Sequence, residues 1–292
     1  MTNGARAAGA RPCYRPKGRL RPLAGLWRRD VGASIATPEG AVTQDFAAPG
    51  NGPFALFLDV DGTLLDLAER PSAVSTPSGL VPSLTKAERK LRGALALVSG
   101  RRIKELDRLF APLRLRASGV HGAEVRIHPD HGATSAPEAA ALPSSLWTDL
   151  TEALREFPGT FAENKIYSFA IHYRLAPDAE APLRRLLTRL VESERRASIE
   201  VVSAHCALEL KARGFDKGSA IEGFLSRDPF LGRTPIFIGD DATDEAGFAV
   251  VAARGGYAYA VGPRRPGTLG AFDEPRAVRD WLAGFAEHGG VA

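Results

Sequence analysis

The sequence predicts an α/β fold: a doubly wound, Rossmann-like parallel sheet into which an α+β unit is inserted. Four runs are apolar at consecutive positions, as in parallel strands that helices cover on both faces. These runs occupy residues 54–60, 94–100, 234–241 and 257–262. Helical patterns lie between and after them, at residues 79–92, 102–111, 216–226 and 243–254. Strands that alternate with helices at this spacing favour crossover connections and therefore a parallel sheet.

The middle of the chain has a different pattern, which predicts the inserted unit. We expect a hairpin over 123–134 and then a helix over 142–157 with Ser144 or Ser145 as its N-cap. Further strands are predicted within 159–174 and 198–212, with a helix between them at 176–196. The predicted division is a basic extension (1–50), a discontinuous core (51–122 and 213–292) and the inserted α+β unit (123–212).

The composition is typical of a soluble globular protein, with 44% hydrophobic and 25% charged residues among 292. No apolar run reaches the length of about 18 residues that would predict a membrane span. The N-terminus also lacks the apolar core of a secretory signal. Cys13 and Cys206 are too few for a disulfide framework, so we expect a cytoplasmic protein.

The net charge of +4 is concentrated at the N-terminus. Residues 1–50 hold eight Lys/Arg and three Asp/Glu, whereas the remainder holds 30 and 31. The folded part is therefore almost neutral, which speaks against a nucleic-acid partner. Pro and Gly interrupt the basic residues of the extension, so a disordered or over-long segment is favoured over a transit peptide or an anion-binding arm.

Residues that carry chemistry stand at the ends of three predicted strands and at one helix start. In an open α/β sheet, ligands bind beyond the carboxyl ends of the strands. The sequence therefore predicts that these side chains converge on one site: Asp59 and Asp61, Ser99-Gly100-Arg101, Lys217, and Asp240, Asp241 and Asp244. A calcium loop is the alternative for "DVDGT", but it would need Gly and Glu where the chain has Leu64 and Arg70.

The order of these motifs resembles the haloacid-dehalogenase superfamily of phosphotransferases. The resemblance spans about residues 53–262 and rests on "DVDGT" (59–63), "SGR" (99–101), Lys217 and "GDDATDE" (239–245). It implies that Asp59 is a nucleophile that forms an aspartyl-phosphate, and that Asp61 is the general acid and base. Gly62 would let the backbone turn closely beside the phosphate.

The resemblance also implies a Mg²⁺ cofactor. Mg²⁺ favours a few carboxylates together with phosphate oxygens and water, which suits Asp59, the backbone carbonyl of Asp61, and Asp240. Ser99 and Lys217 would hold the phosphoryl oxygens. Asp241 and Asp244 are expected to orient metal-bound water or Lys217.

Three further segments resemble the trehalose-6-phosphate phosphatase family, whose inserted unit is a cap over the substrate. They are "GVHGAE" (119–124), "ENKIYSFAIHYR" (163–174) and "LELKARGFDKGSAI" (208–221), with Ala212 at a position where the family usually has Pro. The implied partner is a phosphorylated disaccharide, and the resemblance also implies functional pairing with a trehalose-6-phosphate synthase. Predicted substrate contacts, besides Asp59, Asp61 and Gly62, are Arg101, His121, Glu124, Glu163, Lys165, Glu209 and Lys211.

Structural roles stay open as alternatives for several residues, and other functions stay open for the protein. His172 is interpreted as a structural histidine of an apolar strand, and "HPDH" (128–131) as a polar hairpin tip. Trp147 and Trp281 are expected to anchor helices in the core. The alternative functions are another sugar-phosphate phosphatase, a phosphomutase on the same core, and a non-catalytic module that binds a sugar phosphate.

Overall fold

The computed structural model describes residues 52–68, 73–135, 141–193, 198–204 and 206–288. The predicted extension at 1–50 lies outside the described residues. Within the described part, no helix is both long enough and apolar enough to span a bilayer.

The larger sheet has eight strands in the order β12-β11-β10-β1-β2-β3-β4-β5. Its strands from β12 to β3 pair in parallel, and the last two pair antiparallel. Their bounds are β1 Phe54–Leu58, β2 Leu95–Val98, β3 Arg116–Gly119, β4 Glu124–Arg126, β5 Thr134–Ser135, β10 Thr234–Gly239, β11 Tyr257–Val261 and β12 Gly270–Phe272. The four predicted apolar strands lie side by side in this sheet, which confirms the predicted fold class.

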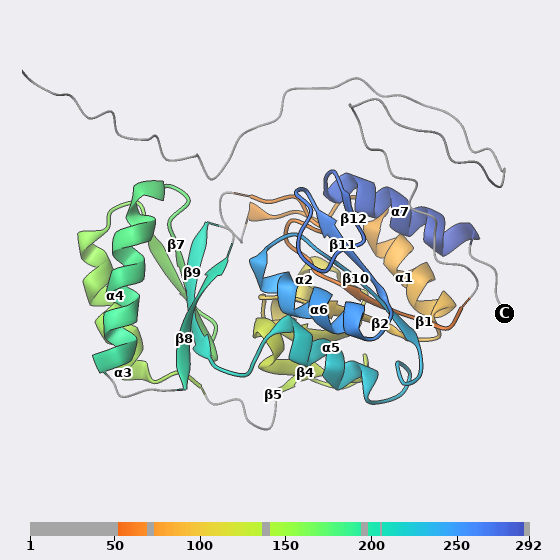
Figure 1. Cartoon of the computed structure of the whole chain (residues 1–292), viewed down its shortest axis with the longest axis horizontal. Coiled ribbons are helices and arrows are strands. Elements are labelled where there is room, and N and C mark those ends of the chain that lie inside the picture. The colour runs from red at the N-terminus through yellow and green to blue at the C-terminus, as the bar shows by residue number, and fades with distance from the viewer. Residues whose placement is uncertain (1–51, 69–72, 136–140, 194–197, 205, 289–292) are drawn as a thin grey trace, which may run out of the picture.

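Helices cover both faces of the larger sheet. Figure 1 shows α1 (Leu80–Lys90) and α7 (Pro275–His288) on one side and α5 (Lys217–Leu225) and α6 (Glu245–Ala253) on the other. Around the larger sheet lie also α2 (Ile103–Leu109) and the 3-10 turns η2 (Val120–Gly122) and η5 (Ala242–Asp244). Apolar residues at helical spacing, such as Leu80, Leu84 and Ala87 of α1, are the ones that are buried.

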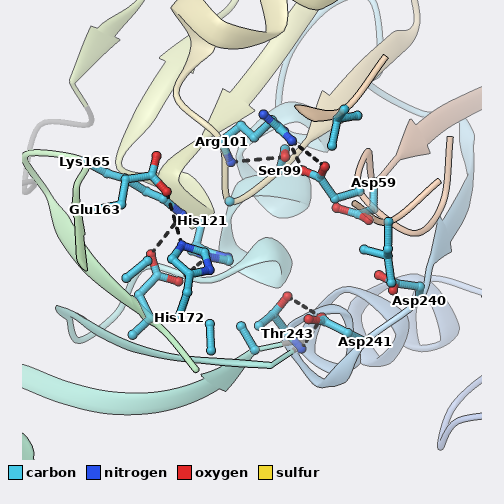
Figure 2. A pocket seen from close by; sticks show the side chains of 18 of the residues that line it. Asp59, Ser99, Arg101, His121, Glu163, Lys165, His172, Asp240, Asp241 and Thr243 are labelled. Atoms are coloured by element: carbon cyan, nitrogen blue, oxygen red, sulfur yellow. Dashed lines mark hydrogen bonds and ion pairs between the residues drawn. The ribbon is translucent and has the colours of Figure 1, made fainter. Parts of the chain in front are cut away.

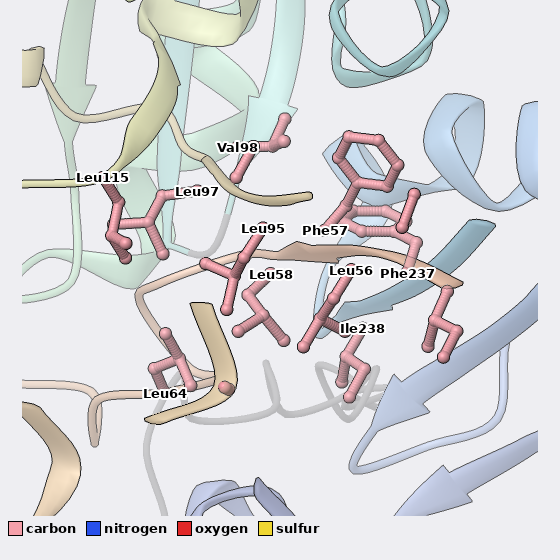
Figure 3. Packing of buried hydrophobic residues seen from close by; sticks show 14 of the residues in the cluster. Leu56, Phe57, Leu58, Leu64, Leu95, Leu97, Val98, Leu115, Phe237 and Ile238 are labelled. Carbon is pink, nitrogen blue, oxygen red and sulfur yellow. The ribbon is translucent and has the colours of Figure 1, made fainter. Parts of the chain in front are cut away.

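Strand β1 runs through the centre of the main core, and all its residues are buried. Phe57 and Phe237, which are register partners, point to one face, and Leu56 and Leu58 to the other (Figure 3). Phe57 stacks on Phe230 with ring centroids 5.3 Å apart. Because burial on both faces fixes β1 in place, the next residue along the chain has a defined position at the carboxyl edge.

The smaller unit, called the cap below, extends from α3 to β9. Its antiparallel sheet has four strands in the order β6-β7-β9-β8. Helices α3 and α4 cover one face of this sheet, and its other face is turned toward the larger sheet (Figure 1). The bounds are α3 Ser144–Ala153, η3 Leu154–Glu156, β6 Phe161–Asn164, β7 Ser168–His172, η4 Pro177–Ala179, α4 Glu180–Ser193, β8 Ile199–Ala204 and β9 Ala207–Ala212.

Alternation along β7 and β9 separates the two faces of the cap sheet. Phe169, Leu208 and Leu210 belong to the helix-covered core, where Trp147 packs against Phe169 at 5.0 Å between centroids. Trp281 stacks on Phe285 in the main core at 5.2 Å. Both tryptophans are therefore helix anchors, as predicted, and the residues between the apolar positions of β7 and β9 face the larger sheet.

Two local predictions differ from the structure. The hairpin predicted over 123–134 forms, but its strands β4 and β5 extend the larger sheet instead of joining the cap. A short antiparallel hairpin can pair with the last parallel strand of a sheet, and the local pattern does not reveal which sheet it will join. Helix α3 starts at Ser144, so its N-cap is Pro143 and not Ser144 or Ser145. The exact boundaries of the predicted domains stay a prediction.

Candidate active site

The predicted nucleophile lies at the carboxyl edge of the sheet, directly after β1. Asp59 is 3% exposed, and its backbone N–H donates to the carbonyl of Ile238 at 3.0 Å. The Nζ of Lys217 is 2.7 Å from the Oδ1 of Asp59 and 2.7 Å from the Oδ1 of Asp244. Lys217 is the first residue of α5, whose start is fixed by a reciprocal capping box between Asp216 and Ser219. The cap of this helix therefore places the lysine between the two carboxylates.

A second acidic segment follows β10. The Oδ2 of Asp244 accepts the backbone N–H groups of Asp240 and Asp241 at 3.1 and 3.0 Å. Asp241 accepts the N–H and the hydroxyl of Thr243 at 2.8 and 2.6 Å. Asp244 therefore orders the loop through one oxygen and Lys217 through the other. Asp244 was predicted to orient metal-bound water or Lys217; it contacts Lys217, and its role in a reaction stays a prediction.

The carboxylates of this segment and of β1 form a cluster that fits a divalent cation. Oxygens of Asp59, Asp240 and Asp244 lie within 4.8 Å of one another. The Oδ2 of Asp59 is buried and has no hydrogen-bond partner in the described part of the chain. Gly62 has φ +80°, and a Cβ there would lie 2.1 Å from the Oδ2 of Asp240, so only glycine leaves this oxygen accessible.

The pKa shifts of the carboxyl groups in this cluster also favour a bound cation. Burial, followed by the neighbouring charges of Asp59, Asp241 and Asp244, raises the pKa of Asp240 well above its ordinary value. Burial also raises the pKa of Asp244 to about 7, although Lys217 opposes this shift. One lysine therefore does not balance the buried carboxylates, and a cation would favour their charged forms. Both oxygens of Asp244 already accept hydrogen bonds, one from Lys217 and one from backbone N–H groups. Asp59 and Asp240 are therefore the better candidates for metal ligands.

The raised pKa of Asp244 predicts how stability depends on pH without metal. In the folded protein this carboxyl keeps its proton up to about pH 7, whereas its ordinary value is 3.8. The folded state then binds more protons than the unfolded state between these values, so the free energy of unfolding falls as pH rises from about 4 to about 7. We expect a loss on the order of 1–3 kcal/mol, measured by urea denaturation in EDTA.

Magnesium should flatten this dependence, because cation binding favours the ionised carboxylates in the folded state only. Asp244→Asn should make the dependence shallower without metal, while Asp59 and Asp240, whose pKa values are also raised, retain part of it. Equal slopes with EDTA, with Mg²⁺ and in the variant would contradict the assignment of this cluster as a cation site.

The predicted acid and base is paired with an arginine. The Nε and an Nη of Arg101 are each 2.6 Å from a different oxygen of Asp61. Arg101 is 9% exposed, and its backbone N–H donates to the Oγ of Ser99 at 3.2 Å. The bidentate pair gives both side chains a defined orientation, and Figure 2 shows Arg101 and Ser99 near Asp59.

The cap places charged side chains opposite Asp59, among them Glu163, Lys165 and Glu209, and this group is called the cap wall below. Glu209 is buried and accepts the hydroxyl of Ser168, and its carboxylate lies 3.6 Å from the Nζ of Lys165 and 2.8 Å from the Nε2 of His121. Glu163 lies 3.4 Å from the Nε2 of His172. Lys165 and His121 lower the pKa of Glu209 well below its ordinary value despite its burial. This wall is therefore a set of charged groups held by one another.

A cavity of about 150 Å³ lies between this wall and the carboxyl edge of the sheet. It brings together most of the predicted site residues from both parts of the chain, as Figure 2 shows for those it labels. The predicted residues that line it are Asp59, Asp61, Ser99, Arg101, His121, Glu163, Lys165, Glu209, Lys217, Asp240 and Asp241.

Gly62 does not line this cavity, and neither do two other predicted substrate contacts, Glu124 and Lys211. Glu124 accepts the Nε of Arg102 and the backbone N–H of Ile103, each at 2.8 Å, so its carboxylate binds the N-terminus of α2 instead. Lys211 has the same strand parity as Glu209 but lies at the end of β9. Its Nζ donates to the carbonyl of Phe215 and is 2.8 Å from Glu200. Both residues are buried in structural contacts.

Four lining residues with polar or charged side chains were not among the predicted site residues: Glu105, His172, Arg174 and Thr243. His172 stacks on Phe161 at 4.4 Å and lines the cavity, so it has both a packing contact and a place in the wall. Arg174 donates to the backbone carbonyl of Ala68, which joins the cap to the loop after β1. The alternation of polar and apolar residues from Ser168 to His172 was the available signal for His172.

Comparison with known proteins agrees with this arrangement. A family model described as trehalose-phosphatase matches residues 57–264. The chain is 39% identical over 259 residues to a probable trehalose-phosphate phosphatase of Sinorhizobium fredii (strain NBRC 101917 / NGR234), covering 86% of this chain and 96% of that protein. It is 40% identical over 210 residues to the trehalose-6-phosphate phosphatase of Escherichia coli (strain K12), covering 72% and 77%.

A solved structure shows the same fold. The C-terminal domain of the C. albicans trehalose-6-phosphate phosphatase matches with a TM-score of 0.69 at 20% identity, covering 80% of this chain and 92% of that one. The match of the family model and the identity to the curated relatives both extend over most of the folded part. The chain therefore belongs to the trehalose-phosphatase family.

Proposed function

We propose that this protein is a Mg²⁺-dependent phosphatase that hydrolyses trehalose 6-phosphate to trehalose and phosphate. One observation carries the proposal: Asp59, Asp61 and Lys217 meet at the sheet edge directly below a cap wall of charged groups. The first set suits phosphoryl transfer, and the second suits a ligand with many hydroxyls.

In the first step, a carboxylate oxygen of Asp59 attacks phosphorus, and the bond from phosphorus to the sugar oxygen breaks. Asp61 donates a proton to that leaving oxygen, so the sugar departs as a neutral alcohol. The phosphoryl group is then an acyl phosphate on Asp59. Uncatalysed hydrolysis of phosphate monoesters is so slow that the site must lower the barrier by on the order of 20 kcal/mol or more.

In the second step, Asp61 accepts a proton from a water molecule, and the resulting oxygen attacks phosphorus and releases Asp59 with inorganic phosphate. Lys217 contacts Asp59 and offers its charge to the phosphoryl oxygens in both steps, together with the hydroxyl of Ser99. Asp59, Asp240 and the carbonyl of Asp61 would hold Mg²⁺, which would supply positive charge against the phosphoryl oxygens.

The cap wall supports a sugar as leaving group. Glu163 and Glu209 offer acceptors and Lys165 a donor for hydroxyl groups, and all three are largely withdrawn from water. A site that hydrogen-bonds hydroxyls rejects ligands without them, because its own buried polar groups are then left unpaired. We therefore expect discrimination among sugar phosphates to depend on these residues.

The test is phosphate release from trehalose 6-phosphate and from a panel of hexose phosphates, each with Mg²⁺. We expect trehalose 6-phosphate to have the highest kcat/KM by at least about tenfold, because several hydroxyl contacts would be lost with the smaller esters. Equal rates on unrelated esters would contradict the substrate. An isomerised sugar phosphate that appears before free phosphate would indicate a phosphomutase, and binding without turnover would indicate a binding module.

Two associated predictions rest on the family resemblance and the composition. The phosphorylated disaccharide would be supplied by a trehalose-6-phosphate synthase, with which functional pairing is expected. A cytoplasmic location would suit a chain with two cysteines.

A further inference from the structure

The turn η2 has a left-handed backbone and contacts both the loop after β2 and the cap. In η2, Val120, His121 and Gly122 have φ values of +47°, +54° and +112°. A branched residue such as valine rarely adopts this backbone conformation, which persists only where the surroundings fix it. Here two hydrogen bonds fix it: the N–H of Val120 donates to Arg101 O at 3.0 Å, and the N–H of His121 to Ser99 O at 3.1 Å.

The imidazole of His121 lies between that loop and the cap. Its Nε2 is 2.8 Å from the Oε2 of Glu209, and the two residues are only 6% and 2% exposed. The same Nε2 would be 2.8 Å from a Cβ at Gly100, so the ring lies directly against the loop backbone. Figure 2 shows this ring between the cap side chains and the loop that carries Ser99 and Arg101.

These contacts point to a role for His121 other than the substrate contact that its sequence motif indicated. The N–H of His121 donates to the carbonyl of Ser99, the N–H of the preceding Val120 donates to that of Arg101, and the imidazole of His121 contacts a cap carboxylate. Glu209 is in turn held by Ser168 and faces Lys165, so it moves with the cap sheet. His121 therefore connects a carboxylate of the cap with the loop beside Asp59.

We propose that His121 is a positioning residue that couples cap closure to the phosphate-binding loop. When the cap closes on the sugar, the contact with Glu209 holds the loop of Ser99–Arg101 in its working arrangement beside Asp59. This proposal rests on the proposed function, which assigns the hydroxyl of Ser99 to the phosphoryl group and gives Asp61, the partner of Arg101, the role of acid and base. If cap closure brings these residues into their working arrangement, we expect its loss to lower kcat more than it raises KM.

The experiment compares His121→Asn with His121→Gln. Asparagine tolerates the left-handed backbone but is too short to reach Glu209, whereas glutamine places its amide nitrogen near the position of Nε2. Three constants are measured with trehalose 6-phosphate: kcat, KM, and the Ki of inorganic phosphate, which binds without engaging the cap. For His121→Asn we expect kcat to fall about 10–100-fold, because small misplacements are this costly, while KM and Ki change less than about twofold.

His121→Gln should recover kcat to within about fivefold of the wild type, since it restores the hydrogen bond to Glu209. His128→Asn, at a half-exposed histidine of the β4–β5 hairpin, is the matched control and should change none of the three constants. A parallel rise in Ki would show that His121 only holds the loop in place, and an effect on KM alone would show a direct sugar contact. Either result overturns the proposal, as does an unchanged kcat.

The substrate and the role of His121 can fail separately. The wild type is first assayed on the panel of sugar phosphates. If it prefers another ester, the substrate under the proposed function is wrong, and the three constants are measured with the preferred ester instead. The same pattern of lowered kcat with constant Ki would then still support the coupling.

Discussion

Asp59→Asn should abolish turnover, with kcat lowered by at least about 10⁴-fold, because the amide cannot form the acyl phosphate. The substitution keeps the shape of the side chain and one oxygen for Lys217, which is 2.7 Å away. Phosphate release from trehalose 6-phosphate, followed to single-turnover sensitivity, measures the loss. Residual activity within tenfold of the wild type would refute Asp59 as the nucleophile.

The same substitution should not destabilise the fold. Burial raises the pKa of Asp59 above its ordinary value although Lys217 opposes the shift, so the charged form is disfavoured where it stands. Without metal, we expect Asp59→Asn to raise the free energy of unfolding by about 1 kcal/mol, because it removes one of several crowded carboxylates. Asp149→Asn, at an exposed position of α3, is the control that should change neither activity nor stability.

The cluster of side chains at the carboxyl edge of the larger sheet could be predicted from sequence, because each of these residues follows a strand or starts a helix. Asp59 follows a strand that is buried on both faces, and Lys217 starts a helix with a recognisable cap. Parallel strands bring their carboxyl ends to one edge, so local signals were enough to bring these side chains together. The free oxygen of Asp59 and its crowding with Asp240 appeared only with the structure.

The cap was harder to predict because its contacts depend on which sheets meet. Glu124 and Lys211 stand in motifs beside true lining residues, yet one binds a helix terminus and the other the linker after β9. The motif pointed to Lys211, which has the strand parity of Glu209, but could not show that it does not line the cavity. The pairing of β4 with β3 was not predicted either, although only the turn η2 and Ala123 separate the two strands.

Lys217→Met should have the largest combined effect on activity and stability. Lys217 is 3% exposed and bridges Asp59 and Asp244, and these carboxylates hold its pKa well above the ordinary value despite burial. Removing it leaves buried carboxylates uncompensated, which costs about 3–5 kcal/mol of unfolding free energy without metal. We also expect kcat to fall by about 10³-fold with Mg²⁺ present, because one fixed cation at the phosphoryl group is lost.

A second substitution separates these two effects. In Lys217→Met with Asp244→Asn, one buried charge disappears, and the amide can still accept the N–H groups of Asp240 and Asp241 through its oxygen. We therefore expect denaturation to show recovery of about 1–2 kcal/mol, a positive coupling between the two sites, while kcat stays low. Lys104→Met, at an exposed position of α2, is the matched control. Recovery of kcat in the double variant would mean that Lys217 serves only to neutralise Asp244, and its assignment to the phosphoryl oxygens would then be wrong.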